Sequence, residues 1–427
     1  MDRLTRSLSL GVLLVTLIGT PARACSNVHG IPGDCQMETW RVPTGAGGAA
    51  PQRLTSVLMN GNWTYHAYEL SPDGQSLLVH LEDGFEIHRA GQPPVRLKLD
   101  LPFTPRDVSW DPDSRRVAFW VAHAPPGGQR RKAVALLDVT ALGAAPPGPD
   151  EVPYEVLYAP DEPFTPSGFA WAPDGQGLLV LEVGVVAPGG PEGRLTRVEV
   201  EGRAARTLAQ TAGPFDFFFT PFGCCDHRLR PRADATALLL GHETGLHAGD
   251  QAGSDLRRLP LPSKGVHNLD WQPVPGSDLV ALFFRRPART PDGRTFVGVH
   301  LARLAEGAAA PEQVHDATNV HTLWFSPRGT HVGWASDEGV WYRRVEGPPG
   351  KTVHVPAPEG APIKGFTWHD DEDRLAFTAG DALFVHDLAA KSVREVWRAG
   401  RPETSFLAEP RFVGDDVLVS RFEDVSR

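Results

Sequence analysis

The sequence Trp171-Ala172-Pro173-Asp174-Gly175 precedes the short apolar run Leu178-Leu179-Val180. Proline presets φ to about −65° at the second position of a turn, aspartate bonds nearby backbone N–H groups, and glycine accepts a left-handed conformation at the exit. An aromatic residue before such a turn and an apolar run after it are typical of two strands joined by a hairpin. The stretch therefore predicts a β-hairpin.

The same unit recurs along the chain. Three further clear copies start at Ser71-Pro72-Asp73-Gly74, Trp110-Asp111-Pro112-Asp113 and Trp324-Phe325-Ser326-Pro327, and four weaker ones at Thr220-Pro221, Trp271-Gln272-Pro273, Trp368-His369-Asp370-Asp371 and Phe412-Val413-Gly414-Asp415. The copies are about 40 to 60 residues apart, which is typical of four-stranded propeller blades with loop insertions. We therefore predict an all-β chain that forms a β-propeller of eight four-stranded blades.

The last copy, at residues 408–422, supplies only two strands. Residues 38–58, with a glycine-rich turn at 45–48, read like the third and fourth strands of a blade. N-terminal strands that complete the last blade would close the ring and remove the open edges of a sheet. We predict this closure, and a single propeller domain that spans residues 25–427.

The first 24 residues read as a cleaved secretory signal. Arg3 and Arg6 precede an apolar run from Leu8 to Ile18, and Ala22-Arg23-Ala24 follows as a cleavage site. The apolar run is shorter than the roughly 20 residues that span a bilayer. A large excess of arginine over lysine is typical of a GC-rich bacterial genome. We predict removal of residues 1–24 and a periplasmic or secreted protein with no transmembrane segment.

An alternative is a lipoprotein, because cleavage after residue 24 would expose Cys25, where a lipid anchor is attached. A lipoprotein signal usually has leucine three residues before the cysteine and a small residue two before it. Here these positions hold Ala22 and Arg23, which disfavour the lipid anchor.

Four cysteines in an exported chain favour disulfides over a thiolate nucleophile or a zinc site. The disulfide candidates are Cys25, Cys35, Cys224 and Cys225, and the sequence leaves all three possible pairings open. Soft sulfur with the imidazole of His227 also suits copper or zinc, but no fourth ligand lies at a recognisable spacing. The sequence therefore predicts disulfides and no metal site.

Composition excludes several classes of protein. With 41% hydrophobic and 22% charged residues the chain is typical of globular domains. The net charge of −10 comes without a basic patch, so nucleic acid is not an expected partner. The glycine run at 45–50 lacks the strand-to-helix context of a dinucleotide loop, and no cofactor is predicted.

The repeated unit resembles the repeats of TolB-like, WD40-like (PD40) β-propellers, which also occur in the propellers of prolyl oligopeptidase enzymes. The resemblance covers nearly the whole chain after the signal, and it implies a propeller and an exported location. The peptidase relatives carry catalysis on a separate α/β-hydrolase domain with a Gly-x-Ser-x-Gly motif, which is absent here. TolB itself has an extra N-terminal domain, and too few residues precede the first repeat to form one.

In a propeller the first strand of each blade lines the central channel, so residues at the start of these strands form a ring at the channel mouth. Counting back four to five residues from each turn places there His66, Arg106, Asp107, Ser167, Asp216, His267, Asn268, His321, Lys364 and Glu409. Such a ring could receive a charged peptide segment or a small ligand. A channel mouth is also polar in the absence of any ligand, because water fills it.

Tryptophans recur at one position of the repeat, which favours a packing role between neighbouring sheets over a ligand platform. They are Trp110, Trp171, Trp271, Trp324 and Trp368. We predict that all five are buried.

Two functions are compatible with these features. The favoured one is a non-enzymatic binding scaffold that contacts another envelope or secreted protein through the channel mouth or one face. Insertions at 122–131, 142–152, 186–193, 222–232 and 285–294 would give these faces their shape. The alternative is a propeller enzyme of the lyase, lactonase or hydrolase type that uses channel His, Asp and Glu residues, with or without a metal.

Overall fold

The computed structural model describes most of the chain between residues 34 and 424. The described ranges are 34–45, 49–60, 68–81, 84–89, 92–99, 108–124, 127–142, 153–172, 174–186, 190–212, 229–231, 238–242, 245–249, 257–258, 269–273, 279–289, 295–303, 312–318, 322–336, 338–345, 352–358, 361–400 and 405–424. Between residues 211 and 299 only the backbone is described. No helix in these ranges is long and apolar enough to cross a membrane.

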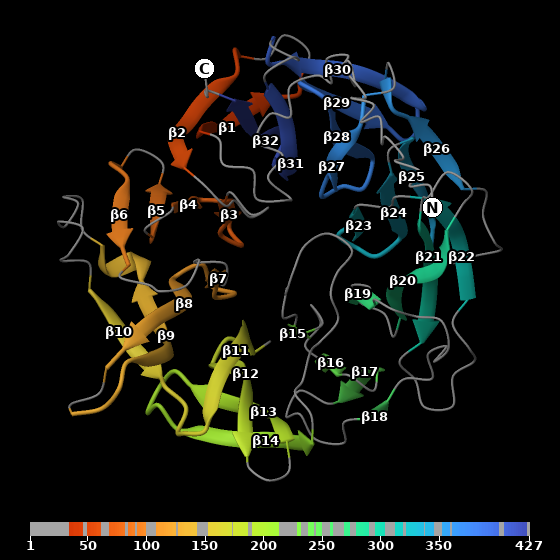
Figure 1. Ribbon diagram of the computed structural model, residues 1–427. Coiled ribbons are helices and arrows are strands. Elements are labelled where there is room, and N and C mark those ends of the chain that lie inside the picture. The colour runs from red at the N-terminus through yellow and green to blue at the C-terminus, as the bar shows by residue number, and fades with distance from the viewer. Residues whose placement is uncertain are drawn as a thin grey trace, which may run out of the picture.

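The strands of the described ranges form eight antiparallel sheets of four strands each. Figure 1 shows these sheets arranged around a common axis, with the chain passing from one sheet to the next around the ring. The chain is therefore a β-propeller, and the predicted fold class is confirmed.

Seven sheets use four consecutive strands. The first three contain β3 (Tyr68–Leu70), β4 (Ser76–Leu81), β5 (Gly84–Arg89) and β6 (Val95–Lys98); β7 (Val108–Trp110), β8 (Arg116–His123), β9 (Arg131–Asp138) and β10 (Tyr154–Tyr158); β11 (Phe164–Trp171), β12 (Gly177–Val186), β13 (Gly190–Glu199) and β14 (Ala205–Ala212). A 3-10 helix, η2 (Val139–Ala141), follows β9, and the side chain of Asp138 caps it.

The next four sheets continue around the ring. They contain β15 (Leu229–Pro231), β16 (Leu238–His242), β17 (Gly245–Gly249) and β18 (Arg257–Arg258); β19 (Leu269–Pro273), β20 (Leu279–Arg289), β21 (Thr295–Arg303) and β22 (Glu312–Thr318); β23 (Thr322–Phe325), β24 (His331–Ser336), β25 (Gly339–Arg344) and β26 (Val353–Pro356); β27 (Ile363–Trp368), β28 (Arg374–Ala379), β29 (Ala382–Asp387) and β30 (Ser392–Arg398).

The eighth sheet joins the two ends of the chain in the order β2-β1-β32-β31. It consists of β1 (Asp34–Pro43), β2 (Gln52–Asn60), β31 (Ser405–Val413) and β32 (Asp416–Asp424). Strand β1 pairs with β32 from Cys35 opposite Asp424 to Pro43 opposite Asp416. The prediction that N-terminal strands complete the last blade is confirmed.

The repeated turns form the hairpins that the sequence predicts. In the turn after β3, Gly74 donates its N–H to the carbonyl of Ser71 at 2.8 Å and adopts a φ of 70°. Asp73 Oδ1 accepts the N–H of Gln75 at 3.0 Å, and Asp174 Oδ1 accepts that of Gln176 at the same distance. Aspartate and glycine therefore have the turn roles that their positions predict.

Apolar side chains pack between neighbouring sheets, and a tryptophan joins two sheets at a fixed position. Trp171 Nε1 donates to the carbonyl of Ser109 on the preceding inner strand at 3.0 Å, and Trp368 Nε1 donates likewise to Trp324 O at 3.1 Å. Trp110 is also buried. The predicted packing role holds for these three tryptophans, while the side chain of Trp271 is outside the described part.

For Trp324 the prediction of burial is wrong, because its side chain is 42% exposed. The residue that takes the tryptophan position in this blade is Phe325, which is opposite Val332 as Trp368 is opposite Leu375. The repeat is therefore shifted by one residue here, and a one-residue shift moves a side chain to the other face of a strand.

Two of the predicted loop insertions, 186–193 and 285–294, are partly strand. Strand β12 continues to Val186, opposite Gly190 at the start of β13, and β20 continues to Arg289, opposite Thr295. Once the register of a hairpin is set, the hydrogen bonds between its two strands continue for as long as the strands stay adjacent. Proline and glycine in these stretches therefore mark the ends of long hairpins.

Candidate functional site

The first strand of each sheet lies nearest the axis of the ring. These inner strands are β3, β7, β11, β15, β19, β23, β27 and β31, and Figure 1 shows them around the centre. Each is an edge strand that pairs with one neighbour only. Residues at the start of an inner strand therefore lie at one axial end of the ring.

Within the part of the chain that the structure describes, three inner strands have a β-bulge near their start. The ladder between β11 and β12 skips Ser167, and the ladder between β27 and β28 skips Lys364. In β31 the pairing shifts between Ala408 and Arg411, so Glu409 and Pro410 form the bulge. A bulge bends its strand and gives a side chain a direction that a regular strand does not allow, and bulges are frequent next to active sites.

The bulges of β27 and β31 contact each other. A Cβ atom on Gly365 would lie 3.1 Å from Pro410 Cδ and 3.4 Å from Glu409 N. Glu409 has a φ of 54°, a left-handed conformation that is uncommon for a residue with a side chain. Two neighbouring blades thus meet through backbone that tolerates little extra volume.

Lys364 extends from β27 toward an aromatic pair in the next blade. Its Nζ lies 5.6 Å from the ring centre of Phe406, and Phe406 stacks on Phe422 at 5.1 Å with an angle of 15° between the rings. Lys364 is exposed, and its ammonium makes no ion pair with any residue in the described ranges. We call Lys364, Phe406, Glu409 and Phe422 the axial site.

The segment that leads to the axial site is held by a buried carboxylate. Asp381, in the turn between β28 and β29, accepts hydrogen bonds from Arg398 Nη1 at 3.0 Å and from the N–H of Gly400 at 3.2 Å. The carbonyl of Gly380 accepts the N–H of Leu407 at 2.8 Å. These contacts fix the start of β31, and with it Phe406, relative to the preceding blade.

Ser167 has the same place in its strand as Lys364, but its hydroxyl is engaged. It donates to the carbonyl of Leu181 on the neighbouring strand at 3.3 Å. Of the predicted mouth residues within the described ranges, Lys364 and Glu409 are therefore the two on neighbouring strands. The other seven lie outside these ranges and stay predictions: His66, Arg106, Asp107, Asp216, His267, Asn268 and His321.

The signal segment and most cysteines are likewise outside the described part of the chain. This applies to residues 1–24 and to Cys25, Cys224 and Cys225. For Cys35 only the backbone is described, at the start of β1. The disulfides stay a prediction.

The aromatic half of the axial site is missing from the sequence prediction. The repeat pattern points only to polar residues at the start of each inner strand, and it does not mark Phe406 or Phe422. Because they are opposite each other on β31 and β32, a pairing of the two strands would have placed them side by side. Both phenylalanine side chains are half-buried in the folded propeller, and their degree of burial depends on contacts between blades.

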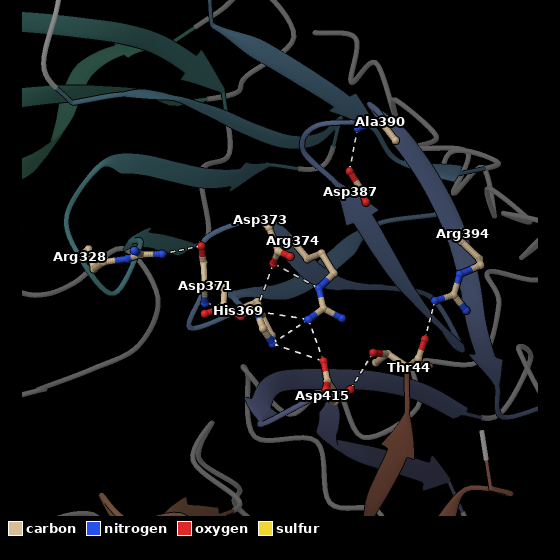
Figure 2. A network of polar contacts seen from close by, with 10 residues as sticks. All are labelled: Thr44, Arg328, His369, Asp371, Asp373, Arg374, Asp387, Ala390, Arg394 and Asp415. Carbon is tan, nitrogen blue, oxygen red and sulfur yellow. Dashed lines mark hydrogen bonds and ion pairs between the residues drawn. The ribbon is translucent and has the colours of Figure 1, made fainter. Parts of the chain in front are cut away.

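A second polar cluster lies at the opposite end of the last two blades (Figure 2). His369 is buried between Asp373 Oδ1, 3.1 Å from its Nδ1, and Arg374 Nη2, 2.8 Å from its Nε2. Arg374 Nη2 also donates to Asp415 Oδ1 at 2.8 Å. This hydrogen bond and the positive charge of Arg374 lower the pKa of Asp415.

The same cluster ties the N-terminal strand to the ring. Thr44, just after β1, donates its hydroxyl to the carbonyl of Asp415 at 2.6 Å, and the Thr44 carbonyl accepts a hydrogen bond from Arg394 on β30 (Figure 2). The cluster therefore connects the turn after β27, the turn after β31, the end of β1 and an outer strand.

Equivalent contacts between neighbouring turns occur in other blades. The N–H of Asp73 donates to Ser114 Oγ at 2.9 Å, and Arg116 Nη2 donates to the carbonyl of Gly175 at 3.2 Å. Glu372 accepts from the N–H of Arg328 and from the Thr330 hydroxyl. Because the contact recurs with different residues, the cluster around His369 has a structural role in joining blades.

In the described ranges, no group of three or more His, Cys, Asp or Glu residues is arranged to hold a metal ion. The predicted channel histidines are not among these residues. Within the described residues, the axial site therefore combines one exposed cation with an aromatic pair.

The chain was compared with known families, sequences and solved structures, and only solved structures gave matches. No family model matches the chain, and no curated protein matches it in sequence. Among solved structures it is similar to Porphyromonas gingivalis dipeptidyl peptidase 4, with 10% identity and a TM-score of 0.52 over 82% of this chain and 55% of that chain. It is also similar to the dihydro-heme d1 dehydrogenase NirN in complex with DHE, with 14% identity and a TM-score of 0.50 over 86% and 76% of the two chains.

A third similar structure is a putative TolB from Agrobacterium tumefaciens, with 16% identity and a TM-score of 0.39 over 68% of this chain and 91% of that chain. The likeness to the first two structures, at 10% and 14% identity, shows the fold alone. Membership of the TolB-like repeat family stays a prediction.

Proposed function

We propose that this propeller is an exported binding scaffold, and that the axial site receives a segment of another envelope or secreted protein. The observation that carries the proposal is the pair of abutting bulges in β27 and β31. Lys364 extends toward the aromatic pair of Phe406, at the start of β31, and Phe422, on β32, so that an exposed charge lies beside half-buried rings. Sites that combine aromatic area with a few placed charges are typical of protein recognition.

The location of the protein supports this proposal without deciding the partner. The N-terminal segment reads as a secretory signal, and this prediction, together with that of disulfides, supports an exported location. A partner met there is another exported protein. Lipid attachment at Cys25 would keep the scaffold at a membrane.

The proposal is tested by selecting dodecapeptides from a displayed random library on the purified chain. Binding of the enriched peptides is then measured by fluorescence anisotropy with Lys364→Glu and with Lys391→Glu. Both variants reverse one exposed lysine in the same blade, and Lys391 lies in the turn between β29 and β30, at the opposite end of the sheet. We expect Lys364→Glu to weaken binding about tenfold or more, while Lys391→Glu leaves it unchanged.

Failure to enrich any peptide, or equal binding by both variants, would contradict the scaffold at this site. The alternative of a channel enzyme is tested in parallel by metal analysis of the purified chain. A stoichiometric metal that is lost in a His267→Ala/His321→Ala variant would support the enzyme and would place its chemistry on the predicted channel histidines.

A further inference from the structure

We infer that the axial site recognises a carboxylate that lies next to an apolar side chain, presented by a peptide segment of the partner. This inference rests on the proposed function and names the chemistry of its ligand. The carboxylate can be an aspartate or glutamate side chain or a chain terminus, since each presents the same charge to Lys364.

The charge of Lys364 carries the first half of the inference. Its ammonium has three donors, and in the described ranges it makes no hydrogen bond or ion pair. Its contact is with the ring of Phe406, whose face attracts a cation without neutralising it. An ammonium held in this way keeps its capacity to bind an anion.

The aromatic pair carries the second half. Phe406 and Phe422 stack nearly parallel and are each partly exposed, so one edge of the pair remains accessible beside the lysine. Apolar area next to a placed charge favours a ligand that carries both features, because burying an apolar group excludes water from the ion pair and strengthens it.

The backbone fixes the two halves relative to each other. Lys364 is on β27 and Phe406 on β31, and the close approach of Gly365 to Pro410 sets the spacing between these strands. Leu407, the residue after Phe406, is bound to the carbonyl of Gly380 in the preceding blade. A ligand therefore meets a site whose charge and aromatic surface are already in position, which lowers the entropy lost on binding.

The test uses two series of defined peptides, so that the source of the carboxylate is identified. In the first, glycine- and serine-rich peptides contain Phe-Asp or Phe-Asn in the middle and have blocked ends. In the second, peptides end in phenylalanine with a free or an amidated C-terminus. Affinities of the labelled peptides for the purified chain are measured directly by fluorescence anisotropy.

We expect the carboxylate form of at least one series to bind about fivefold tighter than its amide, the value of an exposed ion pair. Lys364→Met should remove this difference, and Lys364→Arg should preserve it. Phe406→Leu, which keeps an apolar side chain at the start of β31, should weaken both forms alike. A rise in salt should reduce the carboxylate advantage.

Equal binding of carboxylate and amide forms in both series would overturn the inference, as would a carboxylate advantage that persists in Lys364→Met. In either case the proposed function is judged separately, by the effect of Lys364→Glu on binding of the library peptides. Absence of binding by every peptide in both series also overturns the inference. If the library selection fails as well, the proposed function fails with it.

Discussion

At the scale of single residues, the molecule depends on positions where only one kind of side chain fits. Gly365 is one of them, because the neighbouring strand approaches it closely. The sequence does not mark this position, since the contact involves Pro410 of the next blade. Turn residues were different. Asp73 and Gly74 act within a few residues of themselves, and local chemistry predicted their roles.

Replacing Gly365 by alanine should destabilise the ring. The added methyl group would lie 3.1 Å from Pro410 Cδ, at a φ of 157° that disfavours a side chain. We expect a loss of about 1–3 kcal/mol in the free energy of unfolding. Urea unfolding measures the loss, and Gly45→Ala is the control because no atom lies within 4 Å of its added methyl group. Equal stability of the two variants would show that β31 moves freely.

The tryptophans allow a matched pair of substitutions. Trp171→Phe removes the hydrogen bond to Ser109 O at a site that is 5% exposed, while Trp324→Phe acts at a site that is 42% exposed. We expect Trp171→Phe to cost about 1–3 kcal/mol and Trp324→Phe less than about 0.5 kcal/mol. Thermal unfolding of both variants tests this, and similar losses would contradict the one-residue shift of the repeat.

At the scale of elements, the order of strands and turns follows from the sequence, whereas strand lengths do not. The repeats predict hairpins because each turn carries its own signal. The ends of β12 and β20 depend on how far each strand stays paired with its neighbour. Glycine and proline in these stretches indicate loops, so the sequence does not predict the extra strand length. The sequence predicts Lys364 and Glu409 at the channel mouth, but it does not predict the bulges at these residues, where two blades contact each other.

The packing between the sheet of β23–β26 and that of β27–β30 makes stability depend on pH. His331 stacks on Trp368, and His386 Nε2 lies 3.1 Å from the hydroxyl of Tyr342. Burial lowers the pKa of both histidines, and for His331 a nearby Glu372 opposes part of this effect. In the unfolded chain both titrate near their usual value of about 6.5.

The unfolded state therefore binds protons first as the pH falls below about 6.5, and the free energy of unfolding decreases with it. Above that pH both states hold neutral imidazoles, and the two histidines contribute no slope. Urea unfolding between pH 5 and pH 7.5 measures the effect. A His331→Gln/His386→Gln variant should have a smaller slope than the natural chain. An identical slope in the variant would assign the pH dependence to other groups.

At the scale of the whole molecule, the sequence predicts the ring and its closure because repeats of known length must pair their unmatched strands. The sequence does not predict the side-chain contacts between β1 and β32. Glu38 on β1 illustrates this, since burial would raise its pKa, but hydrogen bonds from Arg53, Trp40 and Arg421 lower it. Arg421 lies at the far end of the chain, and nothing local connects it to Glu38.

Removal of residues 25–58 should therefore weaken the entire ring. It takes away the buried side chains of Met37 and Val42 and leaves the ladder edge of β32 unpaired. We expect a loss of about 3 kcal/mol or more and a less cooperative unfolding transition, measured by calorimetry. A synthetic peptide of residues 34–60, added in trans, should restore part of the loss, and a scrambled peptide should not. Unchanged unfolding after the deletion would contradict a closing role for β1.

The pairing of β1 with β32 also determines when the molecule can be finished. Thr44 and Asp415, which hydrogen bond in this sheet, are 371 residues apart in the chain. During synthesis β1 and β2 are made first and can pair with each other, but the second edge of β1 has no partner until β32 emerges. Any chain that stops short keeps an unpaired edge that proteases and chaperones recognise. The pairing of β1 with β32 is therefore possible only after the last strand has been synthesised, so closure of the ring is a late step in folding.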